Sequence, residues 1–273
     1  MQKNNIMITS KNQSGSYQHY YHFLLGYLLP LVYWLYKEKN ISKYKNIFIE
    51  DTKVMNKHLK NVFPQKVQIF SKHNKSQILY KETLLGFDNK NNYPINKIKE
   101  STKILKKILS NKLFYQKANF KKKILIIDRG KSEDFYNSDE SVIKGSADQR
   151  RSTPNLKSIR ELLNNFDYKY VYLENESLIN QIKIFSESDF IIAQHGAALS
   201  NIIFCDKNTV INEIRPNKKI FKNKDHFENL AFGLGLFYNE IFQENNHSEV
   251  DIVEIFNNIR SHIQRKNTNF FQI

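Results

Sequence analysis

Short apolar runs alternate with amphipathic stretches along most of the chain. Runs of strand length fall at 6–8, 46–50, 66–70, 77–85, 124–127, 168–173, 190–194 and 210–214. Apolar residues at helical spacing lie between many of them, at 52–63, 97–115, 154–166 and 177–187. Strands that alternate with helices predict parallel sheets, so the expected fold class is α/β.

Two further segments have a different pattern. Residues 17–31 are apolar nearly all round, which predicts a buried helix that Pro30 bends or interrupts. The last stretch carries Ile252, Ile255, Phe256, Ile259 and Ile263 at helical spacing, which predicts a closing amphipathic helix. We therefore expect a first domain at 1–115, a second at 116–245 and a closing helix within 246–273.

Composition adds a strong positive charge to this picture. The chain has 273 residues, of which 40% are hydrophobic, so a sizeable core can form. There are 42 Lys+Arg against 27 Asp+Glu, a formal net charge of +15. Such a surface attracts nucleotide diphosphates, other polyanions or anionic membranes, although scattered lysines also suit a plain solvated surface. Because no recognised nucleic-acid motif accompanies the charge, we expect no nucleic-acid partner.

The sequence also indicates in which cellular compartment the protein is expected. Cys205 is the single cysteine, so no intrachain disulfide can form and a reducing compartment is expected. Residues 1–18 lack the pattern of a signal peptide, and the longest apolar run, 23–36, is too short to span a bilayer. We expect a cytoplasmic protein, with peripheral membrane contact through lysines and the aromatic run as a further option.

The strand at 190–194 ends in a turn of small residues. His195, Gly196, Ala197 and Ala198 lead into a second apolar run that includes Ser200 and Asn201, which predicts strand, tight loop and short helix. Unpaired N–H groups at a helix N-terminus favour an anion, and the small residues leave room for a phosphate. The same residues would also suit tight packing alone, so the pattern by itself leaves both readings open.

Other candidates stand at strand ends. Arg129 follows the buried strand 124–127, and ligands of open α/β sheets collect at the carboxyl ends of strands. Glu174 and Glu213 also end strands, where a carboxylate could accept ribose hydroxyls or simply face solvent. His19 and His22 share a helical face, but no third ligand is evident nearby, so no metal site is predicted.

Three separated segments resemble glycosyltransferase family 61, whose members include plant xylosyltransferases and animal N-acetylglucosaminyltransferases. The first is the segment from His195 to Phe204 with the strand at 210–214, and it resembles the family's hallmark. The second is Tyr20-Tyr21-His22 followed by an apolar helix and Leu-Pro, and the third is the Leu-Gly-Leu-x-Tyr segment that ends at Tyr238. Gly26 departs from the family, which commonly has Asp or Glu there to orient or assist the histidine.

The resemblance implies a fold and a reaction. The fold would be two Rossmann-like domains with parallel sheets, of the GT-B type, with a cleft between them. The reaction would be inverting transfer of a sugar from a nucleotide diphosphate sugar, by family habit a UDP-sugar, to a glycan or lipid-linked glycan acceptor. Arg129, Arg150 or Arg151, and Asn155 match the family's layout of donor-binding residues.

The same resemblance suggests roles for the histidines. His22 would be the base that takes the proton from the acceptor hydroxyl, since an imidazole exchanges a proton near neutral pH. His195 would orient the donor phosphates. No Asp-x-Asp occurs in the chain, so we expect no metal and no cofactor besides the donor, and the arginines with the helix end would meet the diphosphate charge. The alternative is a non-catalytic nucleotide-sugar or polyanion-binding protein that lost its chemistry with Gly26.

Overall fold

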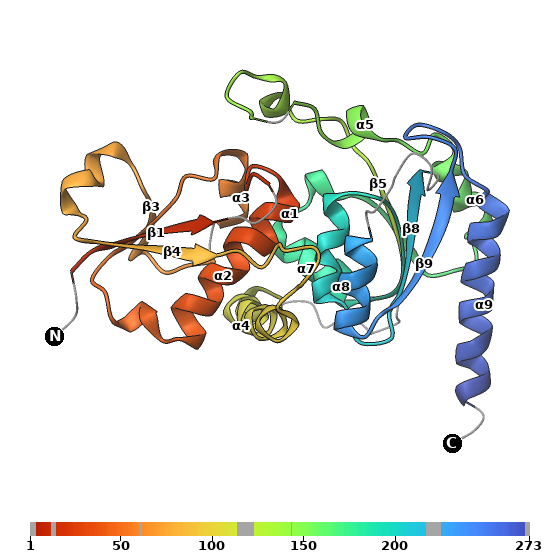
Figure 1. Ribbon diagram of the computed structural model, residues 1–273. Coiled ribbons are helices and arrows are strands. Elements are labelled where there is room, and N and C mark those ends of the chain that lie inside the picture. Colours follow the sequence, from red (N-terminus) through yellow and green to blue (C-terminus); the bar gives the residue numbers. More distant parts are fainter. Residues whose placement is uncertain are drawn as a thin grey trace. The chain divides into compact units, whose positions relative to one another are not determined.

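The computed structural model describes residues 4–11, 15–59, 62–113, 123–142, 144–216 and 225–270. The chain divides into two compact units, each with one parallel sheet (Figure 1). The first unit comprises Met1–Lys117, Asp139–Val142 and Ser177–Ile182, and the second comprises Ala118–Ser138, Ile143–Glu176 and Lys183–Ile273. The predicted boundary between residues 115 and 116 lies outside the described ranges. The α/β class with two parallel sheets, compatible with two Rossmann-like domains, is confirmed.

The sheet of the first unit has four parallel strands. They are β1 (Ile6–Lys11), β2 (Ile47–Ile49), β3 (Val67–Ile69) and β4 (Tyr80–Leu85). Their spatial order is β3-β2-β1-β4. The chain thus adds β2 and β3 on one side of β1 and then returns to place β4 on its other side. The strand order reverses between β1 and β4, and this is where open parallel sheets bind ligands, beyond the carboxyl ends of the strands.

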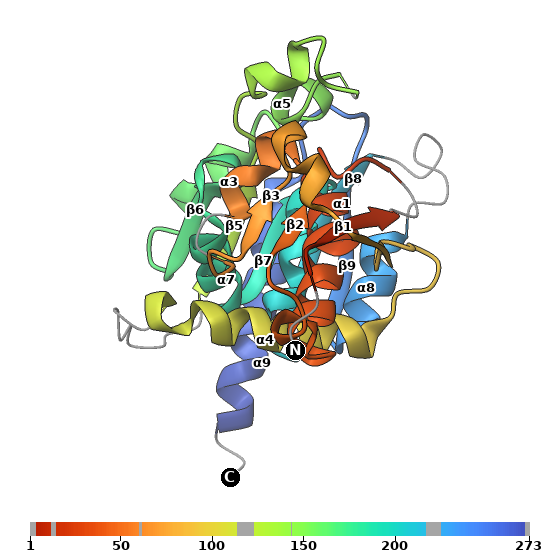
Figure 2. The same ribbon diagram turned by 90° about the vertical axis from the view of Figure 1, so that its left-hand side faces the viewer.

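A buried helical run follows β1, as the apolar pattern predicts. It consists of α1 (Tyr20–Phe23) and α2 (Leu29–Val32), with π-helical turns at Leu24–Leu28 and Tyr33–Lys37. Pro30 does not interrupt the run, because it stands at the start of α2, directly after the π-helical turn. The long helix α4 (Ile95–Leu113) packs on the second half of this run (Figure 2).

The helix expected at 52–63 is shorter than predicted. A 3-10 turn, Lys53–Met55, leads into the single turn α3 (Asn56–Leu59), and residues 60 and 61 lie outside the described ranges. Asn56 accepts hydrogen bonds from both the backbone N–H and the hydroxyl of Thr52, at 3.0 and 2.7 Å. Side-chain bonds of this kind favour tight turns over longer α-helix.

The sheet of the second unit has five parallel strands. They are β5 (Lys123–Asp128), β6 (Tyr168–Tyr172), β7 (Ser188–Gln194), β8 (Val210–Pro216) and β9 (Phe237–Gln243). Their spatial order is β6-β5-β7-β8-β9, so the reversal lies between β5 and β7. The sequence pattern predicts the first four of these strands. The last strand, β9, begins at the end of the segment that resembles the family's Leu-Gly-Leu-x-Tyr motif.

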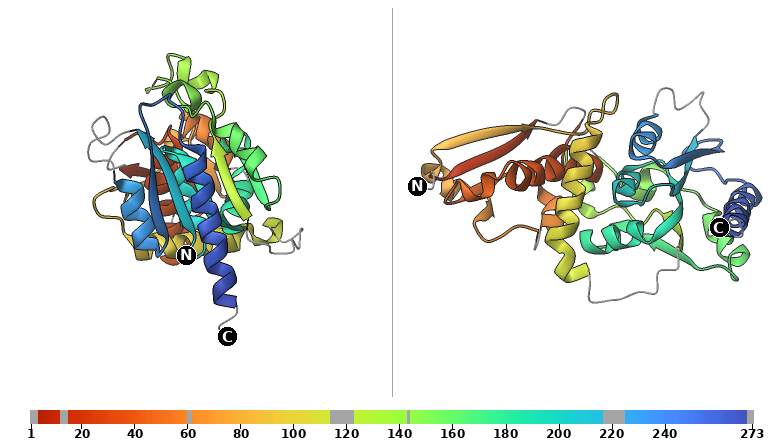
Figure 3. Two further views of the ribbon diagram at one scale, coloured as in Figure 1. Left: turned by 90° about the vertical axis from the view of Figure 1, so that its right-hand side faces the viewer. Right: turned by 90° about the horizontal axis from the view of Figure 1, so that it is seen from below.

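One face of this sheet forms the main core of the second unit. Its strand residues include Ile126 and Ile192, which pack with Ile159 of α6 (Ile159–Leu162) and Ile255 and Ile259 of α9 (Ile252–Phe270). Figure 3 shows α9 along this face, whereas α8 (His226–Leu234) lies on the opposite side of β8 and β9. The closing amphipathic helix is therefore confirmed.

The connections differ from the sequence expectations in two places. Where the helical pattern at 154–166 begins, the structure has a 3-10 turn, Leu156–Ser158, with Asn155 as its N-cap. Leu162, one of the apolar residues of the same helical pattern, is 41% exposed. The helix α7 (Leu178–Ser186) agrees with the prediction. The polar stretch 131–149 contains a 3-10 turn, Asp134–Asn137, and most of the short helix α5 (Ala147–Arg150).

In the described parts of the chain, no helix has the length and apolar character needed to cross a membrane.

The end of α8 yields a stability prediction. Gly235 has φ 83°, in the left-handed region, and the N–H of Leu236 reaches back to Ala231 O at 2.9 Å. Gly235→Ala should lower the free energy of unfolding by about 1 kcal/mol. Gly233→Ala, inside the same helix, should leave it unchanged or raise it by up to about 1 kcal/mol. Urea denaturation of both variants measures the difference, and equal losses would contradict it.

Candidate active site

The reversal point of the second sheet holds Arg129 and His195. Each directly follows a strand, Arg129 after β5 and His195 after β7. The Arg129 guanidinium donates from Nη2 to the carbonyl oxygen of His195 and from Nη1 to that of Ala147 at 3.0 Å. A Cβ atom on Gly196 would overlap this Nη2. A larger residue at 196 would therefore displace the Arg129 guanidinium, while the backbone of Gly196 itself, at φ 167°, is extended.

Arg151 joins Arg129 at the same carbonyl. Its Nη1 lies 3.5 Å from His195 O, and the residue is 9% exposed. Arg150, the other candidate at this place, is exposed. Burial, together with the charge of Arg151, lowers the pKa of Arg129 to about 10, and burial with the charge of Arg150 does the same for Arg151. Both guanidiniums stay protonated at neutral pH, and Arg151, rather than Arg150, completes the pair.

The charge of Arg129 is not neutralised by an ion pair among the described residues. Glu174 exerts the main opposing charge; its Oε2 accepts from Gly130 N at 3.4 Å, and burial raises its pKa. Arg215 in the same unit is different, because it pairs with Glu240 and with Asp225 at 3.3 Å. Two guanidiniums that converge on one carbonyl oxygen concentrate positive charge there, which favours an anionic ligand.

The His195 side chain belongs to a buried network. Its Nδ1 is hydrogen-bonded to Glu213 Oε1, and the Tyr238 hydroxyl donates a hydrogen bond to Glu213 Oε2. The ring of His226 packs edge-on against that of His195, with centroids 5.1 Å apart. Glu213 is 0% exposed, and burial raises its pKa to about 7. In this structure Glu213 faces His195 and Tyr238, and its predicted contact with ribose stays a prediction.

The loop after Gly196 continues as a 3-10 helix, Ala197–Phe204, where the sequence predicts a short helix. Ala197 and Ala198 are half-buried at its start. The Ser200 hydroxyl donates to Ala197 O at 2.6 Å, and the Asn201 amide donates to Ala198 O at 3.2 Å. Both side chains are fully buried, so they fix the shape of the loop from within.

Asn155 has a structural role in this unit. Its amide donates to Val250 O at 2.8 Å and its carbonyl accepts from Val250 N at 3.1 Å. These two hydrogen bonds tie the 3-10 turn before α6 to the segment before α9. The structure therefore brings Arg129, Arg151, His195 and Gly196 into one group and places Asn155 in bonds to the backbone elsewhere in the unit.

The reversal point of the first sheet holds a second histidine and carboxylate pair. His22 lies in α1, in the connection that follows β1, and Asp88 lies in the loop that follows β4. His22 Nδ1 and Asp88 Oδ2 are 2.8 Å apart, with side chains 18% and 0% exposed. Gly26 has no side chain to contact His22, and Asp88 supplies a carboxylate to this histidine from another element.

Backbone contacts hold the loop after β4 against the helical run that contains His22. Phe87 N donates to Leu25 O at 2.8 Å. A Cβ atom on Gly86 would come within 3.1 Å of Gly26 Cα and 2.5 Å of Asp88 Oδ1. On the other side of the imidazole, a Cβ atom on Gly15 would overlap His22 Nε2. Glycines at 15 and 86 thus leave the room in which the pair forms.

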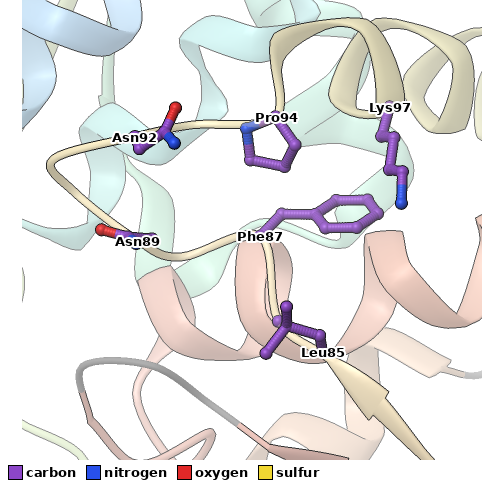
Figure 4. Close-up of a pocket in the computed structure, with 7 residues that line it drawn as sticks. Leu85, Phe87, Asn89, Asn92, Pro94 and Lys97 are labelled. Carbon is purple, nitrogen blue, oxygen red and sulfur yellow. The ribbon is translucent and has the colours of Figure 1, made fainter.

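A pocket of about 220 Å³ opens beside Asp88. Its lining is Leu85, Gly86, Phe87, Asn89, Asn92, Pro94 and Lys97. In Figure 4 the ring of Phe87 lies below Pro94 and Lys97, and the two asparagines come from the turn of the same loop. The pocket walls are mostly apolar, with amide and ammonium groups among them.

Sequence reasoning missed three of these residues. Asp88 falls in a polar loop after a strand, and its position beyond the carboxyl end of a parallel strand is a signal that could have singled it out. Tyr238 stands in a recognised segment, but the segment gives no partner for its hydroxyl. His226 carries no local signal, because its contact with His195 joins residues distant in the sequence.

The comparison with known families identifies the class of protein. The family model described as Glycosyltransferase 61 matches residues 20–212, which include His22, Asp88, Arg129, Arg151 and His195. The chain belongs to this family, as the sequence resemblance indicates, and it is a glycosyltransferase. The family in general takes a nucleotide-sugar donor and a glycan acceptor. A search of curated proteins finds no match to the chain.

The buried Glu213 yields a prediction on pH. Its ordinary pKa is 4.5 and its folded pKa is about 7. Between pH 4.5 and 7, the Glu213 carboxyl is deprotonated in the unfolded chain but still protonated in the folded chain. The free energy of unfolding therefore decreases as pH rises, by up to about 3 kcal/mol. Glu213→Gln should lack this loss, so the free energy of unfolding of wild type relative to the variant should decrease from pH 4.5 to 7.

Urea denaturation at pH 5, 6, 7 and 8 measures this difference. Glu244→Gln, at an exposed position of the same unit, is the control and should follow the wild-type curve at every pH. Parallel curves for wild type and Glu213→Gln would show that Glu213 has no raised pKa.

Proposed function

We propose that the protein is an inverting, metal-independent glycosyltransferase that moves a sugar from a nucleotide diphosphate sugar to a hydroxyl of a glycan or lipid-linked glycan. A UDP-sugar is the proposed donor. The observation that carries this proposal is the guanidinium pair of Arg129 and Arg151 at the carbonyl of His195. It lies where the strand order reverses, and a diphosphate is the anion whose charge and size suit it.

On the donor side, Arg129 and Arg151 hold the two phosphates. Negative charge grows on the diphosphate as its bond to the sugar breaks, so the guanidiniums stabilise the transition state more than the bound donor. His195, held by Glu213, orients the phosphates, and Glu174 accepts ribose hydroxyls. The arginines take the part that a divalent ion has in transferases with an Asp-x-Asp motif, which this chain lacks.

On the acceptor side, His22 is the proposed base. Its imidazole takes the proton of the acceptor hydroxyl while that oxygen attacks the anomeric carbon from the side opposite the diphosphate. One carbon–oxygen bond forms as the other breaks, which inverts the anomeric configuration. We assign acceptor binding to the first unit because it contains His22 and a pocket at the loop that carries its partner Asp88.

The proposal includes the arrangement and location expected for such an enzyme. We propose that the two Rossmann-like domains belong to the GT-B type. The enzyme works in the cytoplasm, where nucleotide sugars are available, and its net charge of +15 suits peripheral contact with an anionic membrane that carries a lipid-linked acceptor.

A thermal-shift screen tests the donor side. Purified protein with EDTA is mixed with UDP, GDP, ADP and their sugars, and at least one nucleotide should raise the melting temperature. Arg129→Ala and Arg151→Ala should each weaken binding about 10-fold or more, because a hydrogen bond to a charged group contributes about 1.5–3 kcal/mol. Arg260→Ala, at an exposed position of α9, is the matched control and should bind as wild type does.

Two outcomes would contradict the proposal. A melting temperature that no nucleotide raises would refute the donor site, and a rise that EDTA abolishes would refute metal independence. Turnover is followed as release of the nucleoside diphosphate from the donor, with water or an added glycan as acceptor. The anomeric configuration of the product, determined by proton NMR, should be inverted.

A further inference from the structure

We propose that Asp88 is the positioning residue for His22, holding its imidazole in the orientation and protonation state in which it accepts a proton. This inference rests on the proposed role of His22 as the base. It assigns a function to a loop, residues 86–94, that the sequence pattern presents only as a polar connection after β4.

The contact between the two side chains is direct and buried. Asp88 Oδ2 lies 2.8 Å from His22 Nδ1, and the carboxylate is 0% exposed. A buried carboxylate is costly unless a hydrogen-bond donor meets it, so the pair favours a proton on Nδ1. The edge-to-face contact of the Tyr21 ring, with centroids 4.9 Å apart, holds the imidazole on a second side. The orientation of His22 is thus fixed by two residues.

The topology supports a functional role for this pair independently of the contact. The strands before His22 and Asp88 are β1 and β4, which are neighbours in the sheet and flank the point where the strand order reverses. The carboxyl ends of such strands are where α/β sheets bind ligands. A purely structural carboxylate could stand anywhere in the core, whereas Asp88 stands at this edge, beside the pocket lined by Phe87 and Asn89.

The chemistry follows from the bond at Nδ1. With the proton on Nδ1 facing Asp88, Nε2 has the lone pair that accepts the acceptor's proton. The O–H bond breaks and an Nε2–H bond forms as the oxygen bonds to the anomeric carbon, and the diphosphate leaves with the electron pair of its former bond. The imidazole becomes a cation in this step, and the adjacent Asp88 carboxylate stabilises that charge.

Nitrogen-15 NMR of histidine-labelled protein tests the protonation state without any substrate. At pH 8 the ring of His22 should carry its proton on Nδ1, and the signal is assigned by its loss in His22→Ala. In Asp88→Asn the population with the proton on Nδ1 should fall. In Glu82→Gln, an acid-to-amide control at an exposed position of β4, the His22 signal should stay as in wild type. A proton on Nε2 in wild type would overturn the proposal.

A double-mutant cycle tests the role in the reaction, with UDP release from a UDP-sugar as the assay. Asp88→Asn should lower kcat by about 10²–10⁴-fold, the usual contribution of a general base, and leave KM for the donor unchanged. His22→Ala and the double variant should have equal residual rates, because Asp88 acts only through His22. Full activity in Asp88→Asn, or a further loss in the double variant, would overturn the proposal.

The two proposals fail in different ways. If no nucleotide stabilises the wild-type protein, the donor site is refuted, while the NMR result for His22 still decides the pairing with Asp88. If wild type binds and turns over the donor but Asp88→Asn retains its rate, the donor site stands and the role of Asp88 is refuted. Thermal unfolding of Asp88→Asn without ligand shows whether the variant is folded before either comparison is made.

Discussion

The structure depends on a constraint of parallel sheets: where the strand order reverses, neighbouring strands send their connections in opposite directions. The carboxyl ends at that point are left uncovered by the crossover helices, and polar groups can meet there. In the first unit the strands are β1 and β4, and in the second they are β5 and β7. Residues that follow these four strands supply His22, Asp88, Arg129 and His195.

Each unit has a histidine whose Nδ1 is bonded to a buried carboxylate, but the surroundings differ. Beside His22, the described residues supply the Tyr21 ring and the carboxylate of Asp88. Beside His195 two guanidiniums converge on its carbonyl oxygen. In the function proposed above, the first pair transfers a proton and the second orients an anion, so the neighbours of the pair determine its task.

The sequence predicts this architecture where local pattern decides it. Strands buried on both faces, such as 124–127, and the small-residue turn at Gly196 are visible in a few residues. Partners that come from distant segments are not visible. Asp88 reaches His22 across 66 residues, and Tyr238 reaches Glu213 across 25. For the same reason the sequence could not choose between Arg150 and Arg151, since the choice depends on which side chain turns inward.

The glycines beside these charged groups have an evolutionary consequence. Gly196 leaves room for the side chain of Arg129, and Gly86 leaves room for Asp88 and the backbone of Gly26, whereas Gly235 is required by its own left-handed backbone. A glycine that makes room for a neighbouring side chain can be replaced once that side chain becomes smaller. Positions 129 and 196 should therefore change together among homologues. A glycine with a left-handed backbone, such as Gly235, should be retained whichever residues surround it. Covariation among homologues would thus distinguish glycines that make space for a neighbouring side chain from glycines that the backbone conformation requires.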